Sequence, residues 1–395
     1  MLLIVKFNFL WYHIYQFKRR DSMKVFIGEC NSCALNYQHY VIYEALMEDF
    51  EITNKVSEAD VIVIAETCCG TQYGILNTIN YLKSIVDNKK AGAKIYLTGC
   101  ITRKFKDDSF LNKVETWLKE NVDYIIPQNQ PNLLLQMISK EKYTDRDKNE
   151  FGFVESHRED LATIYIGNGC LNNCSFCKKT FQNYPLKSAN LNEVKDAIDV
   201  LNEENYSKVL LKATNICQYG LDNYHEYMLP EIIKYLEDKE NIKNVALVGF
   251  SFSDAIKNNF DEVLRTSRKI TEISGALESG SNRLLEMIRK GFTSEEIIEF
   301  VKKIREIYFK QLRLTIISGF PTETLIDVSK TLEVLKQLNP GIVDICRYIN
   351  SSFVDSSKFL QLLPEEIQEH TRIYSRVLKK RSVNTLIYYP EYKYN

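Results

Sequence analysis

The chain has 395 residues, 45% hydrophobic and 26% charged, so it is long enough to bury more than one apolar core and favours two domains. Its formal net charge of −1 excludes a strong overall positive field, although local basic patches leave nucleic acid open as a partner. Ten cysteines are too few for a secreted disulfide scaffold of this length, and their grouping indicates metal binding in a reducing compartment, by default the cytoplasm.

Residues 1–22 are apolar and end in a basic cluster, a pattern shared with signal anchors. Lys6 and His13 interrupt this stretch, and its length is marginal for crossing a bilayer. Met23 then begins a natural first strand. We therefore interpret residues 1–22 as an extension, either disordered or produced by an early start codon, and we expect no membrane association.

Residues 23–139 alternate short apolar runs with amphipathic segments, which is typical of a doubly wound α/β domain with a parallel sheet. The expected strands are 24–28, 60–65, 93–98 and 123–127, and the expected helices are 37–50, 73–88 and 109–121. Residues 140–160 are highly charged and lack apolar periodicity, so we expect an interdomain linker there.

A second α/β series occupies residues 161–381. Its expected strands are 162–167, 208–213, 245–250, 273–277, 312–318 and 342–348, with helical patterns between them, such as 294–307 and 324–338. Six βα units predict a partial (β/α)6 barrel, which places its chemistry at the carboxyl ends of the strands. Residues 382–395 are interpreted as a C-terminal tail.

Cys170, Cys174 and Cys177 directly follow the first strand of this series. Thiolates bind iron–sulfur clusters, and this spacing lets one loop wrap three irons of a cubane while the fourth iron stays open to a ligand. The alternatives are an incomplete zinc site or three unrelated thiols. No histidine or further cysteine follows at zinc-finger spacing, so the cluster is the favoured interpretation.

Cys33, Cys68 and Cys100 each stand just beyond an expected strand of the first domain. Open α/β sheets bind ligands beyond the carboxyl ends of their strands, so the three thiols can meet at one point. A single cysteine is more often a small buried hydrophobe, but three at equivalent positions favour a second cluster site. Cys30 and Cys69 lie nearby and can replace a neighbouring ligand.

The Cys-x-x-x-Cys-x-x-Cys loop resembles that of the radical S-adenosylmethionine (SAM) superfamily. The resemblance implies a [4Fe–4S] cluster with SAM on its open iron, and it places Phe176 near the SAM adenine. In that superfamily an electron from the reduced cluster cleaves SAM to a 5′-deoxyadenosyl radical, which abstracts hydrogen from an unactivated carbon. It also implies an electron donor such as flavodoxin or ferredoxin.

The first-domain cysteines carry a narrower resemblance, to the methylthiotransferases of the MiaB-like and RimO-like family. Cys33 with Asn36, Cys68 after Glu66-Thr, and Cys100 after Thr98-Gly resemble that family's three ligand motifs. The segments 214–222, 277–285 and 317–324 resemble its SAM-binding turns. The resemblance implies an auxiliary [4Fe–4S] cluster, and the SAM contacts that it implies are Thr214, Asn215, Glu278, Ser279, Gly280, Ser281 and Gly319.

This sequence departs from the methylthiotransferase family's pattern at two places that affect the expected substrate. The family's Pro-x-x-Arg-Gly after the third cysteine is not kept, and residues 382–395 are too short for its terminal TRAM barrel. The expected function is methylthiolation at an unactivated C–H bond, with adenosine 37 of a tRNA as the preferred substrate. The alternatives are a peptide or small metabolite, sulfur insertion without methylation, and a non-catalytic iron–sulfur scaffold or redox sensor.

Overall fold

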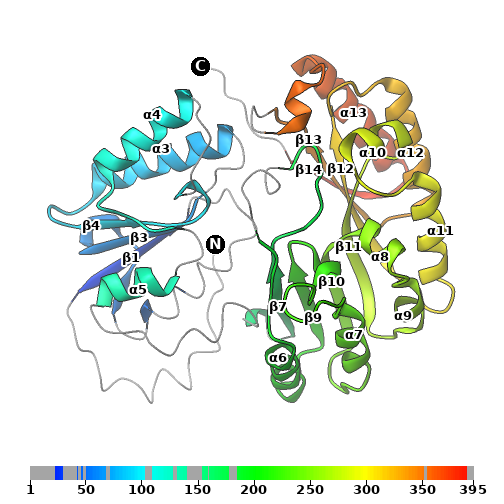
Figure 1. The fold of residues 1–395 in the computed structure, drawn as a ribbon, viewed down its shortest axis with the longest axis horizontal. Helices are drawn as coiled ribbons and strands as arrows, with labels where there is room; N and C mark the ends of the chain where they lie inside the picture. Colours follow the sequence, from blue (N-terminus) through cyan, green and yellow to red (C-terminus); the bar gives the residue numbers. More distant parts are fainter. Residues whose placement is uncertain are drawn as a thin grey trace. The chain divides into compact units, whose positions relative to one another are not determined.

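The computed structural model describes residues 23–29, 42, 46–47, 50–67, 72–102, 109–127, 131–139, 154–158, 160–177, 185–350 and 354–388. The chain divides into two compact units, Met1–Glu150 and Phe151–Asn395 (Figure 1). Among the described residues, no helix combines the length and the apolar character needed to cross a bilayer. Both units are α/β, as the sequence predicts.

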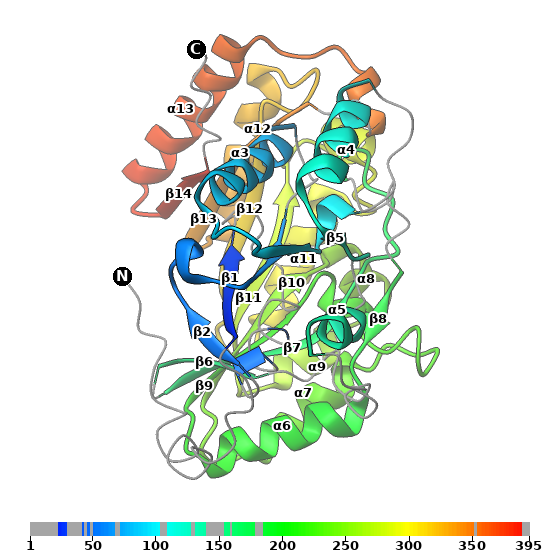
Figure 2. The ribbon, with the colours of Figure 1, turned by 90° about the vertical axis from the view of Figure 1, so that its left-hand side faces the viewer.

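The N-terminal unit contains a parallel sheet with the strand order β2-β1-β3-β4-β5 (Figure 2). The strands are β1 (Lys24–Glu29), β2 (Glu51–Thr53), β3 (Val61–Glu66), β4 (Lys94–Leu97) and β5 (Tyr124–Ile125). The helices are α3 (Gln72–Asn88), α4 (Ser109–Asn121) and α5 (Pro131–Ser139), with short 3-10 turns η1 (Val56–Glu58) and η2 (Cys100–Thr102). The expected helix at 37–50 lies mostly outside the described residues.

The alternation of β3 explains why helices cover both faces of this sheet. Val61 and Val63 point to one face, where they join a buried cluster with Leu134 and Leu135 of α5. Ile64 is also fully buried and occupies an alternate position, so it faces the other side of the sheet. β2 and α5 were not among the predicted elements, because a three-residue edge strand and a nine-residue helix carry little periodicity.

The second unit is built on a nine-stranded sheet with the order β14-β13-β12-β11-β10-β9-β7-β6, and β8 pairs with β7. The six expected strands are β7 (Leu161–Asn168), β9 (Lys208–Ala213), β10 (Asn244–Phe250), β11 (Ile270–Glu278), β12 (Gln311–Ser318) and β13 (Ile342–Arg347). Each pairs in parallel with its neighbour in this order. The partial barrel expected from the sequence is confirmed.

Helices cover the outer side of this sheet (Figure 1). They are α6 (Leu191–Glu203), α7 (Leu229–Glu237), α8 (Phe252–Lys257), α9 (Asp261–Thr266), α10 (Asn282–Ile288), α11 (Ser294–Ile304), α12 (Leu325–Leu338) and α13 (Pro364–Lys380), with the 3-10 turns η4 (Ile216–Gln218) and η5 (Asp355–Lys358). Leu312, Leu314 and Ile316 of β12 are fully buried at alternate positions, so the apolar face of the strand packs under the helices.

Two segments differ from their expected roles. Val154–Arg158, inside the expected linker, forms β6 and pairs antiparallel with β7. Asn384–Tyr388, inside the expected tail, forms β14 and pairs in parallel with β13. Both strands extend the edges of an open sheet, where backbone hydrogen bonds define the element. A polar sequence such as that of β6 has no apolar alternation to reveal it.

The turn from β12 into α12 is fixed by Asp327. Its carboxylate accepts hydrogen bonds from Thr324 at the start of α12, from Ser281 Oγ at 2.6 Å, and from the Arg283 guanidinium. Burial raises the pKa of Asp327, but these donors outweigh burial and lower it to about 2. The charged form of Asp327 therefore holds α10 and α12 together.

We predict that Asp327→Asn lowers the free energy of unfolding by about 2 kcal/mol at pH 7, since the pKa of this carboxyl is depressed in the folded state. A depressed pKa stabilises the fold above the unfolded-state pKa, and this contribution disappears as the pH falls toward 2. The difference between variant and wild type should therefore shrink between roughly pH 4 and pH 2 in chemical denaturation monitored by circular dichroism. Asp196→Asn, on the exposed face of α6, is the control; a pH-independent difference would contradict the prediction.

Candidate functional site: the loop after β7

The candidate site begins where β7 ends. Gly169 has a φ of +86°, and a side chain there would run into the Pro185 carbonyl oxygen. Asn168 Oδ1 accepts hydrogen bonds from the Gly169 backbone N–H at 2.9 Å and from Thr214 Oγ1 at 2.7 Å. Thr214, one of the SAM contacts implied by the sequence, thus supports the start of the loop from the end of β9.

Cys170, Cys174 and Cys177 are not in disulfides, and each is partly exposed. The Cys177 backbone N–H donates to the Cys174 carbonyl at 3.0 Å, which closes a tight turn. The Ser175 backbone contacts α10 through the Ile288 carbonyl at 2.9 Å and η5 through the Ser356 N–H at 3.0 Å. The segment that carries two of the cysteines is therefore held from two sides.

The protein environment disfavours bare thiolates at this loop. Burial raises the pKa of Cys170, and it raises the pKa of Cys174 to about 11 although Lys290 opposes the shift. Metal ligation needs thiolates, so the positive charge that stabilises them has to come from the bound metal. Iron ions of a cluster supply that charge.

The donor set fits a cluster better than a single ion. Within the described part of the chain, no three histidine, cysteine or acidic side chains lie close enough to hold one metal ion. The thiolates of a cubane bind different irons at different corners, so they stand further apart than the ligands of one ion. Ser175 Oγ, between two of the cysteines, is buried without a hydrogen-bond partner, and its hydroxyl can donate to a bound acceptor.

A buried carboxylate, Asp254 in α8, joins the loop to its surroundings. Its oxygens accept hydrogen bonds from Asn172 Nδ2 at 3.1 Å, Asn215 Nδ2 at 2.9 Å and Gln218 Nε2 at 3.1 Å, and from the Ser251 hydroxyl. Asn215 Nδ2 and the Asn172 backbone N–H also lie 3.4 Å from Cys170 Sγ. The implied SAM contact Asn215 thus reaches the first cysteine of the loop.

A buried ion pair lies on the Cys174 side of the site. Glu278 ends β11 with a φ of +64°, an unusual value for a residue other than glycine, and its Oε1 lies 3.3 Å from Lys290 Nζ. Burial lowers the pKa of Lys290, but Glu278 and Cys174 outweigh burial and raise it. Lys290 therefore stays charged beside the cysteine loop.

The remaining implied SAM contacts divide into two groups. Phe176 packs against a buried cluster that includes Ile317 and Phe320 at the end of β12. Ser279, Gly280 and Ser281 are buried instead against α12. The Gly280 N–H donates to Thr331 Oγ1 at 2.9 Å, and a Cβ on Gly280 would lie 2.7 Å from Thr331 Cα. In the structure this turn serves the packing of α12, and its role in SAM binding stays a prediction.

Gly319 is held by a buried network from α13. Its N–H donates to Glu323 Oε2 at 2.6 Å, and the same carboxylate contacts His370 Nδ1 at 2.8 Å and accepts from the Tyr374 hydroxyl at 3.0 Å. The φ of Gly319 is +77°, and a Cβ there would lie 2.5 Å from Ile367. Glycine is therefore required for packing at this position.

The second set of cysteines lies mostly outside the described residues: this applies to Cys33 and Cys68, and to their neighbours Cys30 and Cys69. The backbone of Cys100 opens η2 directly after β4. Thr67 Oγ1 donates to the Thr98 carbonyl at 2.9 Å and accepts from the Ile101 N–H at 3.2 Å. The residue before Cys68 is thus bonded to residues on both sides of Cys100.

Asp254 and Lys290 were not predicted from the sequence. Asp254 follows Ser251 at the spacing of a helix N-cap, and the Ser251 side chain accepts from the Asp254 N–H. That pattern at the carboxyl end of β10 is a usable signal, but it indicates a helix start rather than a site. Lys290 lies two residues after the last residue of α10, Ile288, and the usual interpretation of a lysine after a helix is an exposed charge.

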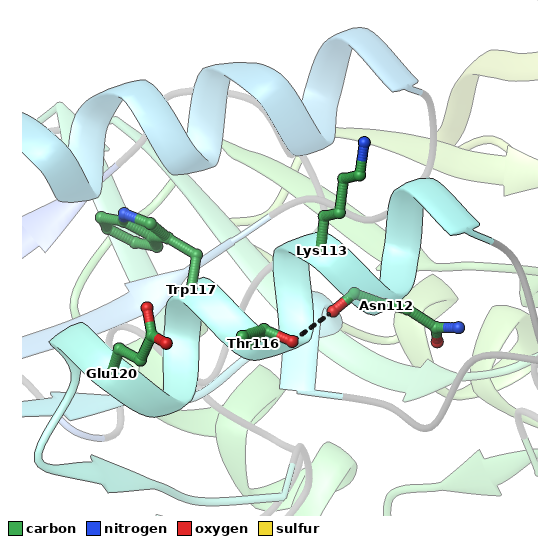
Figure 3. A pocket seen from close by; sticks show the side chains of 5 residues that line it. All are labelled: Asn112, Lys113, Thr116, Trp117 and Glu120. Atoms are coloured by element: carbon green, nitrogen blue, oxygen red, sulfur yellow. Dashed lines mark hydrogen bonds between the residues drawn. The ribbon is translucent and has the colours of Figure 1, made fainter.

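The hollow in Figure 3 has a volume of about 410 Å³ and lies on α4 of the N-terminal unit. Its lining residues are Asn112, Lys113, Thr116, Trp117 and Glu120. All five come from one helix, and four of them are exposed. It contains none of the predicted site residues, so we interpret it as a surface feature.

The family model of the radical SAM superfamily matches residues 164–335, a range that includes the loop after β7. A probable threonylcarbamoyladenosine tRNA methylthiotransferase of Archaeoglobus fulgidus is 29% identical over 81% of this chain and 75% of the relative. The threonylcarbamoyladenosine tRNA methylthiotransferase MtaB of Aquifex aeolicus is 26% identical over 85% of this chain and 83% of its own length.

A third relative, the ribosomal protein uS12 methylthiotransferase RimO of Caldicellulosiruptor saccharolyticus, is 26% identical over 73% of this chain and 67% of the relative. Among solved structures, the radical SAM methyltransferase TsrM of Kitasatospora setae aligns with a TM-score of 0.57 over 85% of this chain and 77% of that chain. Its 13% identity shows the fold alone. The cysteine loop on the partial barrel, the match over residues 164–335 and these relatives support a radical SAM enzyme that is similar to the methylthiotransferases, a family that uses SAM and [4Fe–4S] clusters.

Proposed function

We propose that this enzyme replaces a hydrogen on an unactivated carbon by a methylthio group, and that its substrate is adenosine 37 of a tRNA. The observation that carries the reaction is the loop after β7, which presents three partly exposed cysteines outside any disulfide, in an arrangement that fits a cluster. Support for the substrate comes from two of the relatives, whose names specify threonylcarbamoyladenosine tRNA.

We assign the SAM-binding [4Fe–4S] cluster to Cys170, Cys174 and Cys177. When bound and reduced, this cluster supplies the electron that cleaves SAM to the hydrogen-abstracting 5′-deoxyadenosyl radical. The protein holds the loop through Asp254 and provides N–H donors to Cys170. Glu278 and Lys290 offer a carboxylate and an ammonium group for the charged amino acid end of SAM, and Phe176 offers an apolar surface.

We assign the auxiliary cluster to Cys33, Cys68 and Cys100, with Cys30 and Cys69 as possible substitutes. A parallel sheet of order β2-β1-β3-β4-β5 reverses its winding between β1 and β3, and ligands bind at the carboxyl ends there. Cys33 follows β1 and Cys68 follows β3 in the sequence. The bonds of Thr67 to both flanks of Cys100 support a common site.

The alternative substrate is a peptide, which a RimO relative favours because its name specifies a ribosomal protein. The tRNA proposal rests on the Archaeoglobus fulgidus relative, which is 29% identical to this chain, compared with 26% for this RimO relative. Any such reaction also needs an external electron donor, and we propose a flavodoxin or ferredoxin for that role. We propose the reducing cytoplasm as the compartment, because cysteines that bind iron have to be kept from forming disulfides.

The first test of this proposal is the iron content. Anaerobic reconstitution of the full chain should give about eight irons per chain, because two cubanes carry four irons each. The triple variant Cys33→Ala, Cys68→Ala, Cys100→Ala should retain about half of that iron. Unchanged iron in the triple variant would refute the auxiliary assignment, whereas Cys346→Ala, a cysteine outside both sets, is the control and should change nothing.

The second test concerns the substrate. Deleting the gene should remove a methylthio-adenosine from total tRNA nucleosides analysed by mass spectrometry, and expression of the wild-type chain should restore it. The Cys174→Ala variant should fail to restore it, because the SAM-binding cluster then lacks one of its three ligands. An unchanged nucleoside profile together with loss of a methylthio group from a peptide would replace tRNA by a protein substrate.

A further inference from the structure

The carboxylate of Asp254 connects three strand ends at the cluster loop. Asn172 belongs to the loop after β7, Asn215 and Gln218 belong to the segment after β9, and Ser251 caps α8 after β10. Asp254 is 7% exposed, Asn215 3% and Gln218 2%. One buried group therefore binds side chains that are far apart in the sequence.

The bonds made by Gln218 extend this connection to the loop backbone. Gln218 Oε1 accepts from the Leu171 N–H at 2.8 Å, and Gln218 Nε2 donates to Asn172 Oδ1 at 3.0 Å as well as to Asp254. Leu171 and Asn172 are the two residues after Cys170. The position of the first cysteine thus depends on amides that are oriented by Asp254.

The orientation of Asn215 is determined by its two neighbours. Its Nδ2 lies between Asp254 Oδ2 at 2.9 Å and Cys170 Sγ at 3.4 Å, both of which are acceptors. Turning the amide would place its oxygen against a carboxylate. In the observed orientation the amide oxygen, Asn215 Oδ1, is buried and has no hydrogen-bond partner. The carboxylate therefore directs an N–H toward the sulfur even though this leaves an acceptor unsatisfied.

Asp254 has two opposing effects on the sulfur of Cys170. It places a negative charge one amide away from this sulfur, and it binds the two residues whose N–H groups lie 3.4 Å from the same atom, Asn215 and Asn172. Charge and N–H···S hydrogen bonds act on a cluster in opposite directions. A nearby negative charge lowers the reduction potential, and donors to the sulfurs raise it.

We infer that Asp254 is a positioning residue for the SAM-binding cluster: it holds the amides of Asn172 and Asn215 so that N–H groups point at Cys170 Sγ. This inference rests on the proposed cluster assignment. It predicts that Asp254 controls the reduction potential through Asn215 and not through its charge alone. An alanine at position 254 has no acceptor oxygen, so it keeps none of the three amides in place.

The test is a double-mutant cycle on the midpoint potential of the cluster whose EPR signal changes when SAM is added. The proteins are full-length and anaerobically reconstituted: wild type, Asp254→Ala, Asn215→Ala and the double variant. Asn215→Ala removes a donor to sulfur and should shift the potential to more negative values. In that background, Asp254→Ala removes the charge with no Asn215 amide left to release, and it should shift the potential to more positive values.

In the wild-type background the same Asp254→Ala change also releases the Asn215 amide. Its positive shift should therefore be smaller than in the Asn215→Ala background, or reversed. Equal shifts in the two backgrounds would overturn the inference, because they would mean that Asp254 acts by charge only. Asp238→Asn, an exposed acidic residue after α7, should leave the potential unchanged.

Asn172→Ala provides a second test in case Asp254→Ala does not fold. This change removes the direct bond from the loop side chain to the carboxylate without altering any charge, and the loop is then held to Asp254 only through Gln218. The backbone N–H of residue 172 should point less closely at Cys170 Sγ, so the potential should shift to more negative values. An unchanged potential would overturn the inference. Absence of any SAM-responsive cluster in the wild-type protein would instead refute the proposed function, so the two failures are distinguishable.

Discussion

The structure of the catalytic unit depends on the parallel pairing of six successive strands. Parallel strands place all their carboxyl ends at one edge, so the cysteine loop after β7, Asn215 after β9, Glu278 at the end of β11 and Gly319 after β12 share one rim. The strands themselves are held by apolar side chains packed under the outer helices. Burial of the apolar side chains thus determines where the polar side chains of the site come together, although the apolar side chains supply no reactive group.

Charge at this rim is kept buried and hydrogen-bonded on both sides of the loop. Asp254 accepts from neutral amides and a hydroxyl, whereas Glu278 is paired with the charged Lys290. The two carboxylates therefore have different environments: one is used to orient donors, and the other stands beside a cation. Because water screens neither of them well, each acts on the cysteines more strongly than a surface charge would.

Glycine and serine positions in the family's motifs have a second purpose here. Gly280 allows α12 to approach β11, and Gly319 allows α13 to approach the end of β12. Ser281 bonds Asp327, and Ser279 lies within hydrogen-bond distance of Thr331. Motif residues that resemble ligand contacts therefore also build the helix packing that shapes the rim. A sequence motif alone does not separate these two roles, because both require small side chains at the same places.

The sequence by itself determined the fold class, the six barrel strands and the cysteine loop, because apolar alternation and cysteine spacing are local properties. Only the tertiary structure decided the rest. β6 and β14 exist through pairing at sheet edges, and Asn172, Asn215 and Asp254 meet although up to 82 residues separate them. Lys290, which follows α10, forms an ion pair with Glu278 at the end of β11. Such contacts depend on how strand ends converge in space, which no local pattern in the sequence records.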